Sequence, residues 1–328
     1  MLSEPPTTRP TEAQPRTRAA GLAARAERHP FVMLSLAVVL FSTGPVMVRA
    51  SSVSGEVFSF WRLWFGVVVL GLLTLVHIRT TGRAPSPHAW RLAARAGVFF
   101  GLHQLFFMTA LKATSVVDVT LVNTVAPVAT AVLAVPMFGE RPGVAFRVWS
   151  GVAIAGSALI VLAGSSGPEG DPGGMALAVV NVVWYSLFFL LSKRGRDHLD
   201  VVPFLFGTMA AAAVTVSLWV AVTATAVGTA TRDDLMLAVT VAIVPGVLGH
   251  FLNTWPLRTV PANVPPLMLL AIPFLSGLMA WIFFGEGVGA THVVGGTVTV
   301  AGVAGAVLSP AGRRLLAGSA VPDPYPEA

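Results

Sequence analysis

Hydrogen-bonding side chains recur at helical spacing inside runs of the sequence that are otherwise apolar. In the run at 174–192, Asn181, Trp184 and Tyr185 fall at positions i, i+3 and i+4, so one helix face would carry an amide, an indole and a phenol. Polar groups in such runs are costly and usually face a bundle interior, where they bind a small solute or bridge helices. The other candidates of this kind are Ser42, Thr43, His103, Gln104, Asn123, His250 and Asn253.

Two charged residues accompany these groups. Arg62 lies inside the apolar run at 57–78. It would extend to an interface, pair with a neighbouring helix or attract an anionic group of a solute, and the residue pattern leaves all three open. Asp118 stands at the start of the run at 117–138, where a carboxylate acts as a helix N-cap or carries a proton. It is our candidate for ion coupling.

Several motifs that mark catalytic or nucleotide-binding sites are missing from the sequence. The chain has no cysteine, which excludes disulfides, thiolate metal sites and cysteine nucleophiles. It has no H-E-x-x-H motif, no G-x-S-x-G elbow and no P-loop lysine. The "GEGVG" at 285–289 follows an apolar helix rather than a strand, which argues against a nucleotide loop. We therefore expect no enzymatic activity, no cofactor and no metal.

The elements that carry the polar residues are long apolar helices. Hydrophobic residues make up 55% of the chain and charged residues 11%, against about 25% charged in soluble domains. Runs such as "FVMLSLAVVLFSTGPVMV" (31–48) are apolar around the whole helical circumference and long enough to cross a bilayer. We expect an all-α membrane protein with ten transmembrane helices near 31–49, 57–78, 95–111, 117–138, 147–164, 174–192, 201–226, 235–256, 262–284 and 291–309.

The basic residues predict how these helices are oriented. If the N-terminus is cytoplasmic, 17 Lys and Arg residues lie on the cytoplasmic side, and only Arg49, Lys112 and Arg232 lie outside. This split predicts a multi-pass protein of the cell membrane with both termini in the cytoplasm. The net charge of +6 then reflects topology and contact with anionic membrane lipid, so we expect no nucleic-acid partner. The basic N-terminal tail, 1–30, is expected to be disordered, and 310–328 forms a C-terminal tail.

The sequence contains a repeat. "MFGERPG" at 137–143 is followed 146 residues later by "FFGEGVG" at 283–289. The same shift pairs Gln104 with His250, and a shift of 144 aligns the opening parts of the two copies. Other pairs at the 146 shift are Leu111 and Leu257, Pro127 and Pro273, Gly139 and Gly285, Glu140 and Glu286, Gly143 and Gly289, and Gly156 and Gly302. We therefore divide the chain into repeats at 31–165 and 174–309, joined by a linker at 166–173.

Each repeat holds five spans, and five is an odd number, so the second repeat would enter the membrane from the opposite side. Glu140 would lie at the cytoplasmic edge and Glu286 at the outer edge, each near the positive end of its repeat's last helix. Inverted repeats of this kind are typical of secondary transporters, in which one half moves against the other around a site near the midplane.

Several stretches resemble a known family. The stretch at 110–162, with its proline, its "MFGE" corner and its glycine-rich last span, resembles the EamA-type unit of the drug/metabolite transporter superfamily. "FSFWRLWFG" (58–66) is similar to the family's second span, and "VVWYSLFFLLSKR" (182–194) to its sixth. In the second copy Gly287 replaces Arg141. The resemblance implies ATP-independent passage of small metabolites through a central cavity, without fixing one substrate.

Together these observations predict a secondary transporter for a small polar or amphipathic metabolite, such as an amino-acid-like or toxic compound, and favour export by alternating access. A passive channel, or a receptor or scaffold without transport, is the alternative. The glycine-rich faces at 151–158 and 301–307 would pack within the chain or form the seam of a homodimer.

Overall fold

The computed structural model describes residues 30–138, 143–164, 171–196, 198–254 and 268–310. The tails, Glu140 and most of the linker lie outside these residues. The described elements are all helical, as expected. Those of the first repeat are α2 (Pro30–Ala50), α3 (Gly55–Thr81), α4 (Pro87–Ala113), α5 (Val116–Asn123), α6 (Ala126–Phe138) and α7 (Val144–Gly164).

The second repeat is helical as well. Its elements are α8 (Pro172–Arg196), α9 (Val201–Val222), η1 (Val227–Thr229), α10 (Arg232–Val241), η2 (Ala242–Gly249), α11 (His250–Thr254), α13 (Ile272–Phe284) and α14 (Ala290–Leu308). Within the described residues, seven helical runs are long and apolar enough to cross a membrane. Three shorter apolar helices accompany them, at Val116–Thr130, Val144–Ile160 and Ile272–Phe284.

α4 begins earlier than the sequence predicted. It starts at Pro87 rather than near 95, because the hydroxyl of Ser86 accepts a hydrogen bond from the Ala89 N–H at 3.2 Å and Pro87 occupies the first helical turn. Arg91 and Arg95 therefore belong to the first turns of the helix. Their charges lower the mean hydropathy of residues 87–95, which is why the sequence placed the start of this helix too late.

Three expected spans are interrupted near their middles. The span at 117–138 is two helices, α5 and α6, with a turn at Thr124 and Val125 just before Pro127. In the second repeat, α10 passes into the π-helix η2, which contains Pro245, and α13 begins with Pro273 in its first turn. A proline provides no N–H for the carbonyl four residues before it, which kinks or breaks a helix. α2 by contrast stays helical through Pro45.

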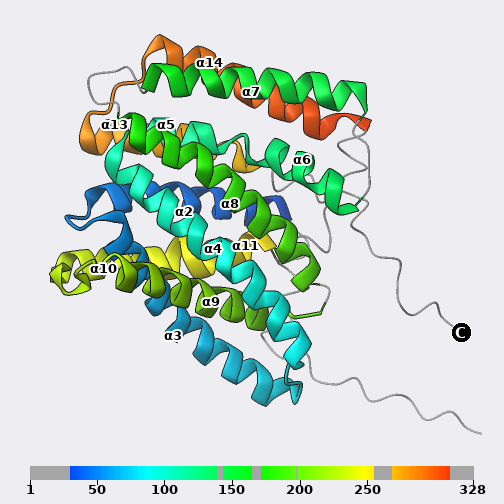
Figure 1. Cartoon of the computed structure of the whole chain (residues 1–328), viewed down its shortest axis with the longest axis vertical. Helices are drawn as coiled ribbons and strands as arrows, with labels where there is room; N and C mark the ends of the chain where they lie inside the picture. The colour runs from blue at the N-terminus through cyan, green and yellow to red at the C-terminus, as the bar shows by residue number, and fades with distance from the viewer. Residues whose placement is uncertain (1–29, 139–142, 165–170, 197, 255–267, 311–328) are drawn as a thin grey trace, which may run out of the picture.

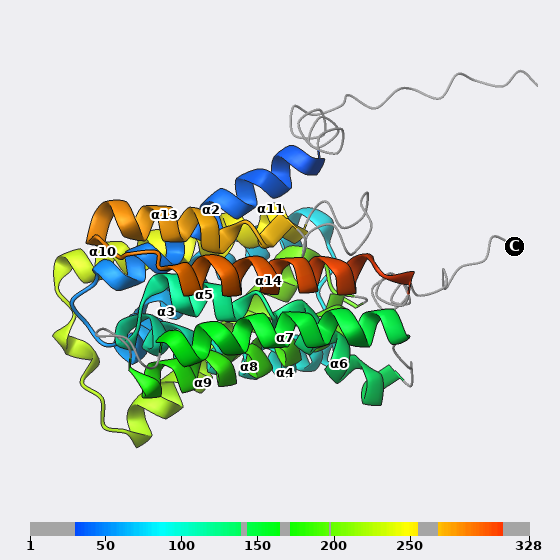
Figure 2. The same cartoon turned by 90° about the horizontal axis from the view of Figure 1, so that it is seen from above.

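α7 and α14 lie side by side along one flank of the bundle (Figures 1 and 2). Glycines allow the close approach: a Cβ on Gly302 would lie 2.3 Å from the Ala153 nitrogen, and one on Gly156 would lie 2.6 Å from the Thr299 nitrogen. The two glycine-rich faces therefore pack against each other within the chain. On the other side of the bundle, α9 packs against α3 and α4, and α8 packs against α4.

The outer surface of the bundle carries many large apolar side chains. On α3, Val68, Leu72 and Val76 recur every fourth residue and are exposed, while Leu63 and Leu70 are buried. A helix that is apolar toward both its neighbours and its surroundings is suited to lipid, because lipid cannot hydrogen bond to exposed polar groups. The fold is thus that of a multi-pass helical membrane protein.

Candidate functional site

A cavity of about 190 Å³ lies among the interrupted helices, with walls from α2, α3, α4, α5, α6, α8, α10, η2, α11 and α13. It is set back from the ends of the helices: Arg62 is roughly 10 Å along α3 from Gly55, and Tyr185 roughly 20 Å along α8 from Pro172, at 1.5 Å per residue. The cavity therefore sits in the middle part of the bundle.

Four prolines mark its wall. Pro45, Pro127, Pro245 and Pro273 all line the cavity. The residues four positions before them, whose carbonyls receive no N–H from the proline, line it as well: Phe41, Asn123, Val241 and Leu269. Helix interruptions at membrane depth are tolerated where they line a cavity, and carbonyls at such interruptions are acceptors for solutes and ions. The prolines thus lie on four helical segments around one space.

The wall is built from equivalent positions of the two repeats. At the 146-residue shift, Gln104 and His250 both line it, and at the 144-residue shift Phe41 and Tyr185 do so. The other equivalent pairs on the wall are Asn123 and Leu269, Thr124 and Leu270, Ala126 and Ile272, Pro127 and Pro273, and Pro45 and Phe189. Each repeat therefore supplies a similar part of the cavity.

Six of the predicted binding residues line the cavity: Arg62, His103, Gln104, Asn123, Tyr185 and His250. Two of them, His103 and Asn123, are hydrogen bonded to Asn181, which does not line the cavity. His103 Nδ1 is 2.7 Å from Asn181 Oδ1, and Asn181 Nδ2 donates to Asn123 Oδ1 at 3.2 Å. Asn181 is fully buried and joins α4, α5 and α8. It thus holds cavity residues in place without lining the cavity itself.

Four further predicted residues also lie off the wall. Ser42 and Thr43 bond back to the Val38 and Leu40 carbonyls of their own helix, each at 2.7 Å. Trp184 is not among the lining residues and lies near Phe99 and Phe106, with ring centroids 6.1 Å apart in both cases. Asn253 lies in α11, outside the set of lining residues. Their roles in binding stay predictions.

Arg62 is buried, with 4% of its surface exposed, so it does not extend to an interface. Its Nη1 donates to Gln104 Oε1 on α4. Its Cζ lies 6.0 Å from the centroid of the Phe100 ring, at the outer limit for a cation–π contact. Its Nε is buried without a hydrogen-bond partner. Arg62 therefore lines the cavity while its buried Nε has no hydrogen-bond partner.

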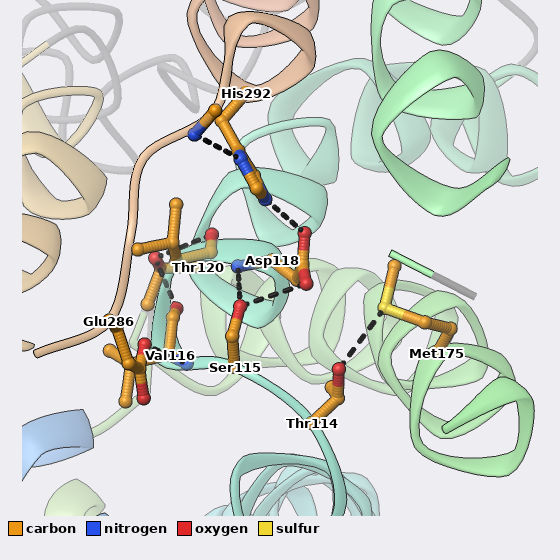
Figure 3. Close-up of polar contacts among 10 residues, drawn as sticks. Thr114, Ser115, Val116, Asp118, Thr120, Met175, Glu286 and His292 are labelled. Atoms are coloured by element: carbon orange, nitrogen blue, oxygen red, sulfur yellow. Dashed lines mark hydrogen bonds and ion pairs between the residues drawn. The ribbon is translucent and has the colours of Figure 1, made fainter. Parts of the chain in front are cut away.

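A polar cluster joins the two repeats at the end of the bundle where α5 and α14 begin (Figure 3). His292 Nε2 of α14 lies 3.0 Å from Asp118 Oδ1 of α5, and the Gly289 N–H donates to His292 Nδ1 at 3.0 Å. Asp118 is not the N-cap of α5. That position belongs to Ser115, whose Oγ accepts from the Asp118 N–H at 3.0 Å and donates to Asp118 Oδ2 at 2.8 Å.

Glu286 forms a second link between the repeats at this end. Its Oε2 accepts from the Val116 N–H at 2.9 Å, and its Oε1 lies 3.8 Å from Arg49 Nε. The carboxylate thus meets the positive N-terminal end of α5, whereas the sequence indicated the last helix of its own repeat. Arg49 also donates to the Lys112 carbonyl at 3.2 Å, and Lys112 donates to the Ser51 carbonyl.

Asp234, which sequence reasoning did not single out, forms a third link. Its carboxylate accepts from the backbone N–H and the hydroxyl of Ser52, both at 2.7 Å. It also accepts from Thr231 and closes a capping box at the start of α10. The sequence "TRDD" at 231–234 could have indicated the N-terminal cap of α10. The contact of Asp234 with Ser52 could not be predicted in this way, because it depends on packing between the repeats.

Sequence reasoning also missed the apolar part of the wall, such as Phe41, Phe107 and Phe189. The 144-residue shift was the available signal, because it pairs Phe41 with Tyr185, a residue already among the candidates. Among the described residues, no group of three or more His, Asp or Glu side chains is arranged to hold a metal ion.

The fold and this site define a multi-pass helical membrane protein whose two repeats enclose a small central cavity. The chain belongs to the EamA-like transporter family, whose model matches residues 30–162 and 172–308. An "Uncharacterized transporter" of Archaeoglobus fulgidus is 26% identical over 285 residues, which are 85% of this chain and 96% of that protein. A solved crystal structure has a similar fold, with a TM-score of 0.59 at 20% identity, covering 86% of this chain and 98% of the other.

Proposed function

We propose that the protein is a secondary transporter that exports a small polar or amphipathic metabolite across the cell membrane by alternating access. It would cross the membrane ten times, with both termini in the cytoplasm, and would use neither catalysis nor a cofactor. The observation that carries this proposal is the cavity wall, to which equivalent positions of both repeats contribute. Two similar half-sites around one cavity are what a pair of repeats needs in order to expose a solute first to one side and then to the other.

The polar links between the repeats support an assignment of the conformation. Asp118–His292, Glu286–Val116 and Ser52–Asp234 all lie at the end that the basic residues predict to be outside. The cavity extends away from that end, to Phe189 on α8 and Thr130 on α6. We infer from this arrangement a state that is closed on the outside.

The dimensions and lining of the cavity limit the solute. About 190 Å³ is below the roughly 300 Å³ at which pockets for drug-sized ligands begin. Aromatic rings of Phe41, Phe107 and Tyr185 stand beside the amides of Gln104 and Asn123. Such a wall suits a small amphipathic molecule whose apolar part contacts the rings and whose polar part meets the amides.

The Asp118–His292 pair is the candidate for proton coupling. The Gly289 N–H occupies His292 Nδ1, so a neutral ring would donate from Nε2 to Asp118. Protonation of the ring would place a hydrogen on Nδ1 and remove the contact with Gly289. The protonated ring would still donate from Nε2 to Asp118, now as an ion pair, so a proton bound here would strengthen a contact between the repeats.

Reconstitution into liposomes tests the function. A carrier gives saturable uptake and counterflow, in which an internal solute accelerates entry of the same labelled solute. Flux that rises without saturation would identify a channel, and the absence of flux across a broad metabolite panel would leave a receptor or scaffold. The same purified protein, sized by light scattering in detergent, tests whether it forms a homodimer.

A further inference from the structure

We propose that the cavity binds a solute through one carboxylate group, which contacts the guanidinium of Arg62. The inference rests on the proposed transport function and names the chemical class of the solute. It places a single anionic group beside α3 and α4, with the apolar remainder of the solute against the aromatic wall.

The first argument is the state of Arg62. The residue is 4% exposed, and its single described side-chain hydrogen-bond partner is the neutral Gln104. Its Nε, an N–H donor aligned with one edge of the guanidinium plane, has no partner. A guanidinium presents paired N–H groups that match the two oxygens of a carboxylate. Arg62 therefore has hydrogen-bonding capacity that no described side chain of the protein fills, and a carboxylate in the cavity would fill it.

The second argument is the charge of the cavity. None of the described lining residues is Asp or Glu, and no ion pair of Arg62 is found among the described residues. His103 and His250, on neighbouring positions of the wall, add no negative charge. A buried cation without a counter-charge is costly, and an anionic ligand offsets that cost when it enters.

The third argument separates a carboxylate from a phosphate ester. Arg62 is the one Lys or Arg among the described lining residues. A phosphate group carries close to two charges at neutral pH and would call for more cationic partners than one. One guanidinium matches one carboxylate in both charge and geometry. The aromatic rings of Phe41, Phe107 and Tyr185 then favour an apolar body on the same solute.

The test compares acids with amides of the same shape. Phenylacetate and phenylacetamide, and hexanoate and hexanamide, are titrated by calorimetry into purified full-length protein. Each pair differs in charge while its apolar body is unchanged. The variants are Arg62→Gln and Gln104→Glu, and the matched control is Arg79→Gln, which changes an exposed arginine on the same helix. Gln104→Glu keeps Arg62 and the side-chain length but places a carboxylate of the protein beside the guanidinium.

We expect the wild type to bind the acids and to discriminate against the amides. Arg62→Gln should weaken binding of the acids at least about 30-fold, the cost of removing one partner of a buried charge pair. Gln104→Glu should weaken it too, because its own carboxylate occupies Arg62, and Arg79→Gln should have no effect. Since Arg62→Gln removes a contact between helices, Gln104→Glu decides the question if the first variant does not fold.

The inference is overturned if acids and amides bind equally, if neither binds, or if the preference for acids survives in Gln104→Glu. Counterflow in liposomes then separates this failure from a failure of the proposed function. Saturable counterflow of a solute without a carboxylate would support the transport function and contradict the carboxylate site. Absence of saturable flux for every compound would remove the transport function as well.

Discussion

Replacing Asp234 by alanine should open the outer end of the bundle. The carboxylate of Asp234 in the second repeat accepts two hydrogen bonds from Ser52 in the first, both at 2.7 Å. If this contact holds the outside closed, its loss favours the state that is open to the outside. The effect follows from thermodynamics, because a contact present in one state only contributes its whole free energy to the equilibrium between the two.

The size of the effect can be estimated from those two bonds. A hydrogen bond to a charged group contributes roughly 1.5–3 kcal/mol. Ser52 lies at the end of the bundle, where water can form some of the hydrogen bonds that the substitution removes. We therefore count the two Ser52–Asp234 bonds together as one. A change of 1.5–3 kcal/mol shifts the equilibrium between the two states about 10- to 150-fold.

The assay measures access to the cavity from outside. The chain has no cysteine, so Thr120→Cys, at a residue that lines the cavity, gives a single reactive thiol without further changes. A membrane-impermeant methanethiosulfonate is added outside intact cells, and the rate of modification is followed. The rate should rise in the Asp234→Ala background in proportion to the outward-open population.

Two controls isolate the contact between the repeats. Asp233→Ala removes a neighbouring but exposed carboxylate from the same helical turn, and Thr231→Ala weakens the cap of α10 while leaving Ser52 and Asp234 in place. Neither should raise the rate of modification. The reasoning is refuted if Asp234→Ala leaves the rate at the wild-type value, or if Asp233→Ala raises it equally.

Three further outcomes follow from the contacts. Gly302→Leu should lower the free energy of unfolding in detergent by about 3 kcal/mol, because its Cβ would meet the Ala153 backbone at 2.3 Å; unchanged stability would contradict the close packing of α7 and α14. Asp118→Asn and His292→Gln should each remove the response of transport to an imposed pH gradient, and a retained response would exclude the pair as the coupling site. Asn181→Ala should slow transport of an identified solute with little loss of protein, and a wild-type rate would show that its hydrogen bonds do not support the site.

The fold was largely predictable because its main determinant is local. Apolar runs of spanning length predict the helical membrane class, and the two corner motifs predict the repeat. Helix boundaries followed less closely: Arg91 and Arg95 disguised the first turns of α4, whose start depends on the Ser86 cap. The interruptions followed the prolines, although the sequence alone did not distinguish Pro45, which leaves α2 helical, from Pro127, which divides a span.

The site was predictable only in part. Polar residues in apolar runs identified six residues of the wall, because burial of a polar group is costly wherever it occurs. The same rule cannot tell a residue on the wall from one just behind it, and Asn181 proved to be of the second kind. It also gives no sign of the partners of Asp118 and Glu286, since these are more than 160 residues away along the chain.

The central claim is that two repeats of one unit cross the membrane in opposite directions, and accessibility of equivalent residues tests it most directly. Gly143 and Gly289 are equivalent at the 146-residue shift, and both are exposed. In single-cysteine variants of the cysteine-free chain, an impermeant maleimide added to intact cells should label Gly289→Cys but not Gly143→Cys, and inside-out vesicles should reverse the pattern. Labelling of both residues from the same side would contradict the inverted repeat and the transport mechanism built on it.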